Sequence, residues 1–353
     1  MIKYIQKNKK QNKLKKKSIS ILFRTAGGKT KTKELGLGHI FRCINLAKKM
    51  QPVKKNFLVE DYGGAIRVIK QNGFRKCFPA KINQSLENEI DETRRFIEQN
   101  KIDLVVIDKY KVNRKFVSSL RKYVSVVVIT DLKKKDYSAD LLVNGFIGFE
   151  NKIEKNRFGT RCLLGPKFQI INDFKPRKYS KQKKNFKLLA TFGGYDVQNI
   201  SGILSEQIRE HGIKFKTKII VGPSTDKDLT KKKIKSLKNL EIIKSTTDMF
   251  GEISKAEVGI CSGGITSYEF ALGKIPFAII CQHKHQLLTA REWEKRGICK
   301  NLGLVDKNIE RKIKKFLKNI EEENFNFKNI KKNTLDRKGS KRVAKEILKI
   351  IKN

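Results

Sequence analysis

The feature that most constrains this chain is a regular alternation of short apolar runs with amphipathic segments. The apolar runs are rich in Val, Ile, Leu and Phe, which is typical of buried strands, and the segments between them carry apolar residues every three or four positions, as helices do. In the first part of the chain the expected strands are residues 19–23, 57–60, 104–107, 124–130 and 140–143. The expected helices are residues 40–50, 65–72, 87–99 and 113–122. This series predicts a parallel sheet with right-handed crossovers.

A polar, Lys-rich stretch that contains Pro176 interrupts the alternation, which then resumes. The expected strands of the second part are residues 188–192, 218–221, 240–243, 258–261 and 277–281. The expected helices are residues 197–211, 266–272, 287–296 and 340–352. A chain of 353 residues has the length of two domains of roughly 150 residues each.

We therefore predict an α/β protein with two Rossmann-like, doubly wound domains. Their predicted limits are 19–175 and 188–335, with a basic tail at 1–18, a linker at 176–187 and a C-terminal helix at 336–353. Ligands of doubly wound sheets bind at the carboxyl ends of the strands, and two such domains joined by one linker leave a cleft between them. This interdomain cleft is the predicted ligand site.

Composition narrows the classes of function. Lys and Arg number 80 against 35 Asp and Glu, which gives a formal net charge of +45, and this surplus is spread over nearly every expected element without interleaved aromatic residues. The distribution favours a general lysine bias, and a charge-driven nucleic-acid-binding protein is kept as an alternative. No apolar run approaches the roughly 20 residues of a membrane span, and the six Cys form no C-x-x-C pair. We expect a cytoplasmic protein with reduced thiols.

The first part of the chain places chemistry-bearing residues directly after its strands. Residues 24–28 are expected to form a basic loop after the first strand, and Gly36-x-Gly38-His39 opens the helix that follows. Glycines at such a turn let backbone N–H groups approach an anion, and a histidine there can act as a general base. Asp108 and Tyr110 follow the strand at 104–107, and Asp131 follows the strand at 124–130. These side chains are either turn residues or groups that face the cleft.

The second part repeats the arrangement of a strand, a glycine pair and a helix. Glycine pairs after strands can bring backbone donors to a diphosphate, and Ser or Thr hydroxyls either add donors or cap the helix. A Glu near the start of a helix either accepts hydrogen bonds from ribose hydroxyls or interacts with the helix dipole. The candidate nucleotide-binding residues are Gly193, Gly194, Ser262, Gly263, Gly264, Thr266, Ser267, Glu269, His285 and Gln286.

The order of these motifs resembles one enzyme family. The motifs are Gly36-x-Gly38-His39-x-x-Arg42-Cys43, Ile107-Asp108-x-Tyr110, Leu164-Gly165-Pro166, Phe192-Gly193-Gly194, Ser262-Gly263-Gly264-x-Thr266-Ser267-x-Glu269 and Gln286. Together with Lys338-Gly339-x-x-Arg342-Val343-Ala344 they resemble the UDP-2,4-diacetamido-2,4,6-trideoxy-β-L-altropyranose hydrolases of pseudaminic acid biosynthesis, the spore-coat polysaccharide protein G type. That family is similar to the peptidoglycan UDP-N-acetylglucosamine transferase and has the two-domain GT-B architecture.

The resemblance implies a reaction and a role for each motif. The implied reaction is hydrolysis of the UDP-sugar at the anomeric carbon, without a cofactor or a metal, and the implied base is His39. Arg24, Gly38, Arg42, Asp108 and Tyr110 would bind the sugar, and the candidate nucleotide-binding residues would hold UDP. The partners expected are the UDP-sugar and, weakly, an acidic membrane surface; we expect a monomer that binds no nucleic acid.

This chain departs from the family pattern in two loops. Residues 25–28 and the insertion 29–34 stand where the family usually has an acidic residue, and His285 stands where it often has Asn. Gln282-His283-Lys284 is more similar to the corresponding loop of the transferase. A GT-B glycosyltransferase that uses a UDP-amino-sugar donor is therefore the alternative function.

Overall fold

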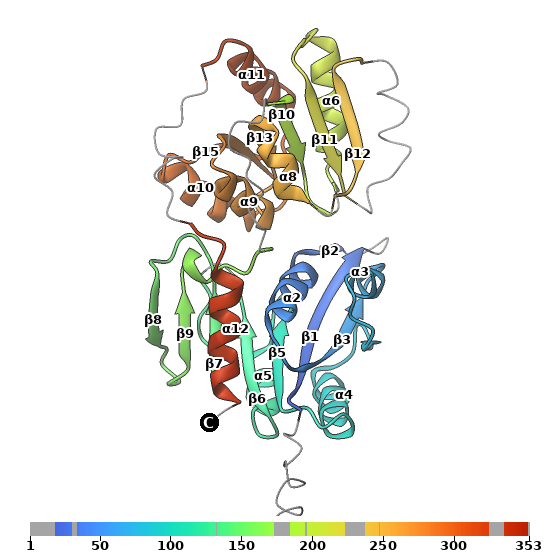
Figure 1. Ribbon diagram of the computed structural model, residues 1–353, viewed down its shortest axis with the longest axis vertical. Coiled ribbons are helices and arrows are strands. Elements are labelled where there is room, and N and C mark those ends of the chain that lie inside the picture. The colour runs from blue at the N-terminus through green and yellow to red at the C-terminus, as the bar shows by residue number, and fades with distance from the viewer. Residues whose placement is uncertain are drawn as a thin grey trace, which may run out of the picture.

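The computed structural model describes residues 18–29, 34–131, 133–172, 184–194, 196–222, 237–246, 248–324 and 335–351. Two α/β domains follow each other along the chain, each built on a sheet of its own (Figure 1). Residues 1–17 of the predicted tail, residues 30–33 of the predicted insertion 29–34 and residues 176–183 of the predicted linker lie outside the described residues. The prediction of an α/β protein with two Rossmann-like domains is confirmed.

The N-terminal sheet has the strand order β4-β3-β1-β5-β6-β7-β9-β8, with β2 paired to β1. Its ladders are parallel except for β1 with β2 and β8 with β9. The strands are β1 (Ser20–Lys29), β2 (Glu34–Gly36), β3 (Lys54–Asp61), β4 (Cys77–Pro79), β5 (Leu104–Asp108), β6 (Ser125–Ile129), β7 (Leu141–Asn144), β8 (Lys152–Lys155) and β9 (Arg161–Leu164). The helices are α2 (Gly38–Lys49), α3 (Ala65–Gln71), α4 (Leu86–Gln99) and α5 (Arg114–Leu120), and the single-turn η2 (Pro166–Phe168) closes the domain.

The C-terminal sheet is parallel and has the order β12-β11-β10-β13-β14-β15. Its strands are β10 (Phe186–Thr191), β11 (Thr217–Val221), β12 (Leu240–Lys244), β13 (Ala256–Cys261), β14 (Phe277–Cys281) and β15 (Cys299–Leu304). Its helices are α6 (Ile200–Glu210), α8 (Met249–Ser254), α9 (Ile265–Gly273), α10 (Gln286–Lys295) and α11 (Ile309–Glu321). The chain order reverses between β10 and β13, and this reversal places the ends of the two strands side by side.

The predicted loop at residues 24–28 is wrong, because β1 continues through it to Lys29. The parallel ladder with β3 extends as far as the pair Gly27 and Asp61, so this segment keeps its backbone partners. The short strands β4, β8 and β9, the strand β15 and the helices α8 and α11 were not predicted. The strands β4, β8 and β15 lie at sheet edges, where the apolar pattern is short. The helix α11 does carry apolar residues at helical spacing, namely Ile309, Ile313, Phe316, Leu317 and Ile320, and the prediction missed it.

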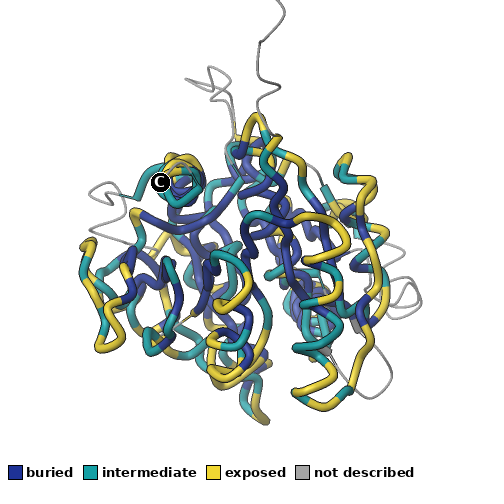
Figure 2. The backbone as a smooth tube through the Cα atoms, turned by 90° about the horizontal axis from the view of Figure 1, so that it is seen from below, coloured by how far each residue is buried: buried dark blue, intermediate teal, exposed yellow. Residues whose placement is uncertain are grey.

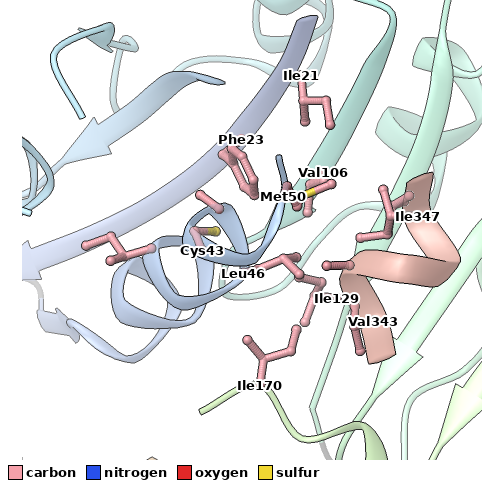
Figure 3. Packing of buried hydrophobic residues seen from close by; sticks show 14 of the residues in the cluster. Ile21, Phe23, Cys43, Leu46, Met50, Val106, Ile129, Ile170, Val343 and Ile347 are labelled. Atoms are coloured by element: carbon pink, nitrogen blue, oxygen red, sulfur yellow. The ribbon is translucent and has the colours of Figure 1, made fainter. Parts of the chain in front are cut away.

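The C-terminal helix α12 (Gly339–Ile350) packs on the N-terminal domain, although it follows the C-terminal domain in sequence (Figure 1). Its apolar side chains Val343, Ala344 and Ile347 join the core formed by α2 and the sheet (Figure 3). Gly339 lies directly against Gln169, where an added Cβ would come within 2.1 Å of the Gln169 carbonyl oxygen. The buried residues form the inside of both domains, and the exposed ones line the outer turns (Figure 2).

A loop of the N-terminal domain ties the two domains together. Phe146 and Ile147, just after β7, are buried in the core of the C-terminal domain. The backbone N–H of Ile147 donates a 3.0 Å hydrogen bond to the hydroxyl oxygen of Tyr268 in α9. Because both residues are buried, this bond fixes the position of α9 relative to the N-terminal sheet. None of the described helices combines the length and the hydropathy needed to cross a bilayer.

Replacing Tyr268 by Phe should lower the free energy of unfolding by about 1–3 kcal/mol, because the buried N–H of Ile147 loses its partner. Urea unfolding measures this change. Tyr123→Phe is the matched control, because Tyr123 is exposed and should tolerate the loss of its hydroxyl. Equal stability of Tyr268→Phe and the wild type would contradict the assigned contact.

Candidate active site

The carboxyl ends of the two sheets face each other across the domain boundary. Figure 1 shows β1 and β10 running toward this boundary from opposite sides. An added Cβ on Gly38 would lie 3.9 Å from Cδ1 of Ile265 in α9, and one on Gly194 would lie 3.2 Å from Cδ1 of Leu37. The N-terminus of α2 therefore lies against both the Gly193–Gly194 turn and the N-terminus of α9.

His39, in the first turn of α2, forms a dyad with Asp108 at the end of β5. The distance from His39 Nδ1 to Asp108 Oδ1 is 2.7 Å, and the Asp108 side chain is fully buried. An ionised carboxylate only accepts hydrogen bonds, so Asp108 favours the tautomer with the hydrogen on Nδ1. His39 Nε2 then carries the free lone pair and can accept a proton from a reacting group.

Arg42, one turn along α2 from His39, holds Asp108 from its other side. Its Nε donates to Asp108 Oδ2 at 2.7 Å, and its Nη2 donates to Asp108 Oδ1 at 2.5 Å. The same guanidinium also binds Asp131, which follows β6. Burial alone would lower the pKa of Arg42, but Asp108 and Asp131 outweigh it and raise the pKa above its ordinary value. The helix α2 thus carries both the base and the cation that fixes its partner.

Arg24 is not placed with these residues. It is fully buried in β1, where Nη2 donates to Glu60 Oε1 at 2.7 Å and to Glu89 Oε1 at 3.0 Å. Its neighbours Ile21 and Phe23 pack toward α2, whereas Leu22 packs on the opposite side of the sheet. Because side chains alternate along a strand, Arg24 lies on the side away from His39. The predicted substrate contact of Arg24 is therefore corrected to a structural ion pair.

Tyr110 is two residues beyond Asp108 and is 48% exposed. The ammonium of Lys111 lies 5.3 Å from the centre of its ring. An exposed aromatic ring can stack on a ligand, and the role of Tyr110 in sugar binding stays a prediction.

The glycine turns of the C-terminal domain pack together at the ends of β10, β11 and β13. Thr191 pairs with Cys261 in the ladder between β10 and β13, so the turns that follow are neighbours. Gly193 has a φ of +88°, and an added Cβ would lie 3.7 Å from Ser262 Oγ. Gly222 lies so close to the Gly193–Gly194 turn that a Cβ added to Gly222 would come within 2.4 Å of the Gly193 carbonyl oxygen. Gly222, which was not predicted, supports this turn by having no side chain.

The N-terminus of α9 presents the other predicted nucleotide ligands. Its N-cap, Gly264, provides no side-chain cap, so the first backbone N–H groups remain available to an anion. Ser267 is buried, and its hydroxyl donates to Gly264 O at 2.7 Å and accepts from Trp293 Nε1 at 3.2 Å. The predicted contact of the Ser267 hydroxyl with UDP is therefore corrected to a bond that stabilises α9, whereas Thr266 is only half-buried.

The loop between β14 and α10 closes this side of the site. Gln282 Nε2 donates to the Phe192 carbonyl oxygen at 2.7 Å, and the Gln282 backbone N–H donates to Gln286 Oε1 at 2.8 Å. Gln286 also packs against Gly263, where an added Cβ would lie 2.9 Å from the Gln286 Cβ. His283 and His285 are exposed and their rings stack at 5.5 Å. Among the described residues no cluster of His, Cys, Asp or Glu could hold a metal ion.

Glu269 lies in α9 and has no hydrogen-bond partner within the described parts of the chain. Burial raises its pKa to about 7. A carboxylate without a protein partner, at the same end of the sheet as the glycine turns, can accept hydrogen bonds from a ligand's hydroxyl groups.

This raised pKa makes folding stability depend on pH. The pKa of the unfolded chain is near 4.5, so the folded state holds the extra proton between about pH 4.5 and 7, and stability falls as pH rises through this range. Glu269→Gln should therefore raise Tm at pH 8 and leave it unchanged at pH 4. Calorimetry at the two pH values measures the difference, and Glu210→Gln serves as an exposed control in α6. An equal change in Tm at both values would contradict the assignment.

Comparison with known proteins shows to which family the C-terminal half belongs. The model of the glycosyltransferase family 28 C-terminal domain matches residues 168–347, slightly more than half of the chain. An uncharacterized Methanocaldococcus jannaschii protein is 26% identical over 272 residues, which cover 72% of this chain and 54% of that protein. The chain therefore spans about half the length of that relative. The Bacillus subtilis spore coat polysaccharide biosynthesis protein SpsG is 23% identical over 282 residues, which cover 77% of this chain and 81% of SpsG.

Solved structures share the two-domain arrangement. MurG from Acinetobacter baumannii has a TM-score of 0.64 at 14% identity, over 94% of this chain and 99% of MurG. The UDP-GlcNAc 2-epimerase from Neisseria meningitidis, solved with UDP-GlcNAc, has a TM-score of 0.56 at 11% identity, over 95% of this chain and 100% of the epimerase. At these identities the likeness shows the GT-B fold. With the family match and the glycine turns of its second domain, the chain belongs to the family of proteins with a glycosyltransferase family 28 C-terminal domain.

Proposed function

We propose that this protein is an enzyme that hydrolyses a UDP-linked diacetamido-trideoxyhexose at the anomeric carbon, as in the biosynthesis of pseudaminic acid. The observation that carries the proposal is the His39–Asp108 dyad at the N-terminus of α2, which lies against the glycine turns of the C-terminal domain. A base on one domain and an anion-binding surface on the other suit a sugar nucleotide whose sugar lies on the first and whose diphosphate lies on the second.

The dyad supplies the base for attack by water. His39 Nε2 removes a proton from water while the water oxygen forms a bond to the anomeric carbon. The bond between this carbon and the diphosphate oxygen breaks, and UDP leaves with the electron pair. Asp108 stabilises the imidazolium that results, because its carboxylate lies 2.7 Å from Nδ1.

The C-terminal domain stabilises the departing diphosphate. The Gly193–Gly194 turn and the N-terminus of α9 bring backbone N–H groups to the boundary between the domains. These donors are fixed before the reaction, so they can stabilise negative charge on UDP without rearrangement. Thr266 and Glu269 would contact the remainder of the nucleotide, and SpsG and the UDP-GlcNAc-bound epimerase support a sugar nucleotide as the ligand.

A glycosyltransferase that uses a UDP-amino-sugar donor is the alternative function. The family match favours it, because the matching family carries the name of glycosyltransferases. The same dyad could deprotonate a hydroxyl of an acceptor in place of water. The two functions differ only in the nucleophile, so the test must measure turnover in the absence of an acceptor.

The test is UDP release from a panel of UDP-linked amino sugars without acceptor or added metal, with the sugar product followed by NMR. Rapid formation of the free sugar from the diacetamido-trideoxy donor is the result expected of the hydrolase. The anomer that forms first shows from which side water attacks. Binding of UDP with negligible release would overturn hydrolysis and favour the transferase.

A further inference from the structure

Asp131 differs from Asp108 in exposure although the same guanidinium binds both. Asp131 follows β6, the strand next to β5, so the two carboxylates lie at neighbouring strand ends. The Asp108 side chain is fully buried, whereas 52% of the Asp131 side chain is exposed. Asp108 thus faces the protein interior, and Asp131 has one side on Arg42 and another on solvent.

The cluster of Arg42, Asp108 and Asp131 holds one more negative charge than a structural ion pair requires. Asp108 already neutralises Arg42, whose side chain is 5% exposed, through two hydrogen bonds from the guanidinium. Asp131 adds a second negative charge, so the set of Arg42, Asp108 and Asp131 carries a net charge of −1 at the domain boundary. Arg42 keeps Asp131 ionised, because its positive charge and hydrogen bonds hold the pKa of this carboxyl below its ordinary value.

Arg42 also fixes the orientation of Asp131. Arg42 Nη2 donates to Asp131 Oδ2 at 3.2 Å, and Arg42 Nη1 donates to Asp131 Oδ1. A carboxylate offers about four acceptor positions, so these bonds leave acceptor positions on both oxygens. The result is an acceptor that is held in place and remains accessible.

Arg42 links Asp131 to the base of the proposed reaction, because its Nη2 donates to Asp131 Oδ2 at 3.2 Å and lies 3.0 Å from His39 Nδ1. Asp131 interacts electrostatically with His39 of its own domain and with His285 of the C-terminal domain. His285 precedes α10, in the loop that contacts the glycine turns through Gln282 and Gln286. Asp131 therefore lies beside the base, on the domain that would hold the sugar of a UDP-sugar, and within electrostatic range of the loop that borders the glycine turns.

We propose that Asp131 contacts the sugar directly, as a fixed acceptor for an N–H or O–H group of the hexose, and so helps to select sugars that carry such donors. This inference rests on the proposed function, because it assumes that the ligand is a UDP-sugar. It assigns recognition of the sugar to the end of β6 and leaves UDP recognition to the C-terminal domain.

The test compares the binding of UDP, UDP-glucose and UDP-N-acetylglucosamine by calorimetry. Binding is measured in the His39→Ala protein, where turnover does not interfere, with and without Asp131→Asn. Asn keeps one acceptor oxygen for Arg42, so this variant should fold, and Tm checks it. The matched control is Asp136→Asn, which removes a half-exposed carboxylate paired with Arg114 elsewhere on the N-terminal domain.

Asp131→Asn should weaken UDP-N-acetylglucosamine binding about ten- to a hundredfold, the range for a hydrogen bond to a charged group, and leave the Kd of UDP unchanged. If the variant loses more affinity for UDP-N-acetylglucosamine than for UDP-glucose, the donor on the sugar is an N–H group. If it loses the same affinity for both, the donor is a hydroxyl. If Asp131→Asn left the ratio of each UDP-sugar's Kd to the Kd of UDP unchanged, the inference would be overturned. Because binding does not require turnover, failure of the hydrolase assay leaves this result intact.

If Asp131→Asn lowers Tm strongly, Asp131→Glu provides the second measurement. Glu retains the charge and the bond to Arg42 but moves the acceptor oxygens by one methylene group. A sugar contact predicts that the ratio of the Kd of UDP-N-acetylglucosamine to that of UDP rises in Asp131→Glu. A ratio equal to that of the His39→Ala protein would limit Asp131 to holding Arg42 and would overturn the inference.

Discussion

Replacing His39 by Ala is expected to lower kcat for UDP release by about 10²–10⁴-fold, the range that a positioned general base contributes. The reason is geometric, because His39 Nδ1 is held by Asp108 at 2.7 Å and Nε2 is the nitrogen left to take the proton from water. The Kd of UDP should stay near its wild-type value, since the nucleotide is proposed to lie on the other domain. Steady-state kinetics and calorimetry measure the two quantities.

The matched control for this prediction is His211→Ala. His211 caps the C-terminus of α6 and its Nε2 lies 3.2 Å from Gln207 Oε1, away from the domain boundary. Its removal should leave kcat unchanged. Wild-type turnover in His39→Ala would exclude His39 as the base, and a parallel loss of UDP affinity would show that His39 acts on binding.

Replacing Asp108 by Asn should affect both catalysis and stability. The neutral amide can no longer hold the His39 tautomer that accepts a proton on Nε2, and the comparable change in a serine protease triad lowers kcat about 10⁴-fold. It also leaves the buried Arg42 without its main counter-charge, which should cost about 3 kcal/mol of unfolding free energy. Kinetics at a temperature well below Tm, together with urea unfolding, separate the two effects.

Glu60→Gln distinguishes loss of a buried charge from loss of the dyad. Glu60 Oε1 accepts hydrogen bonds of 2.7 Å from both Arg24 and Lys109, on the other side of the same sheet. This variant should be destabilised to a similar extent as Asp108→Asn and retain kcat. If both variants lost activity equally, instability of the N-terminal domain would explain the effect and Asp108 would have no specific role.

Local periodicity predicted most of the strands and helices, although it also marks α11, which the prediction missed. Residues 277–281 were predicted as a strand and form β14, and residues 65–72 were predicted as a helix and form α3 to within one residue. The strand β1 was predicted to end six residues earlier than it does, because Arg24 inside it looks like a loop residue. The buried guanidinium of Arg24 is stabilised there by its ion pairs with Glu60 and Glu89.

The sequence predicted those site residues that directly follow a strand and whose type suits catalysis or binding. His39 and Asp108 were singled out separately, and the sequence indicated no contact between them. Gly222 carries no signal in the sequence, because its role comes from close approach to the Gly193–Gly194 turn. Asp131 was noted as a weaker form of the same strand-end pattern, and its bond to Arg42 joins residues 89 positions apart.

The sequence by itself determined the α/β class, the two series of strands and helices, and the strand ends at which chemistry can occur, because these follow from local periodicity and glycine placement. The tertiary structure decided which of those ends meet. It brought His39, Arg42, Asp108 and Asp131 together, moved Arg24 into the opposite side of the sheet, and returned α12 to the N-terminal domain. These outcomes depend on pairing between distant segments, where burial of charge and packing of apolar faces select the partner, and no local pattern encodes that choice.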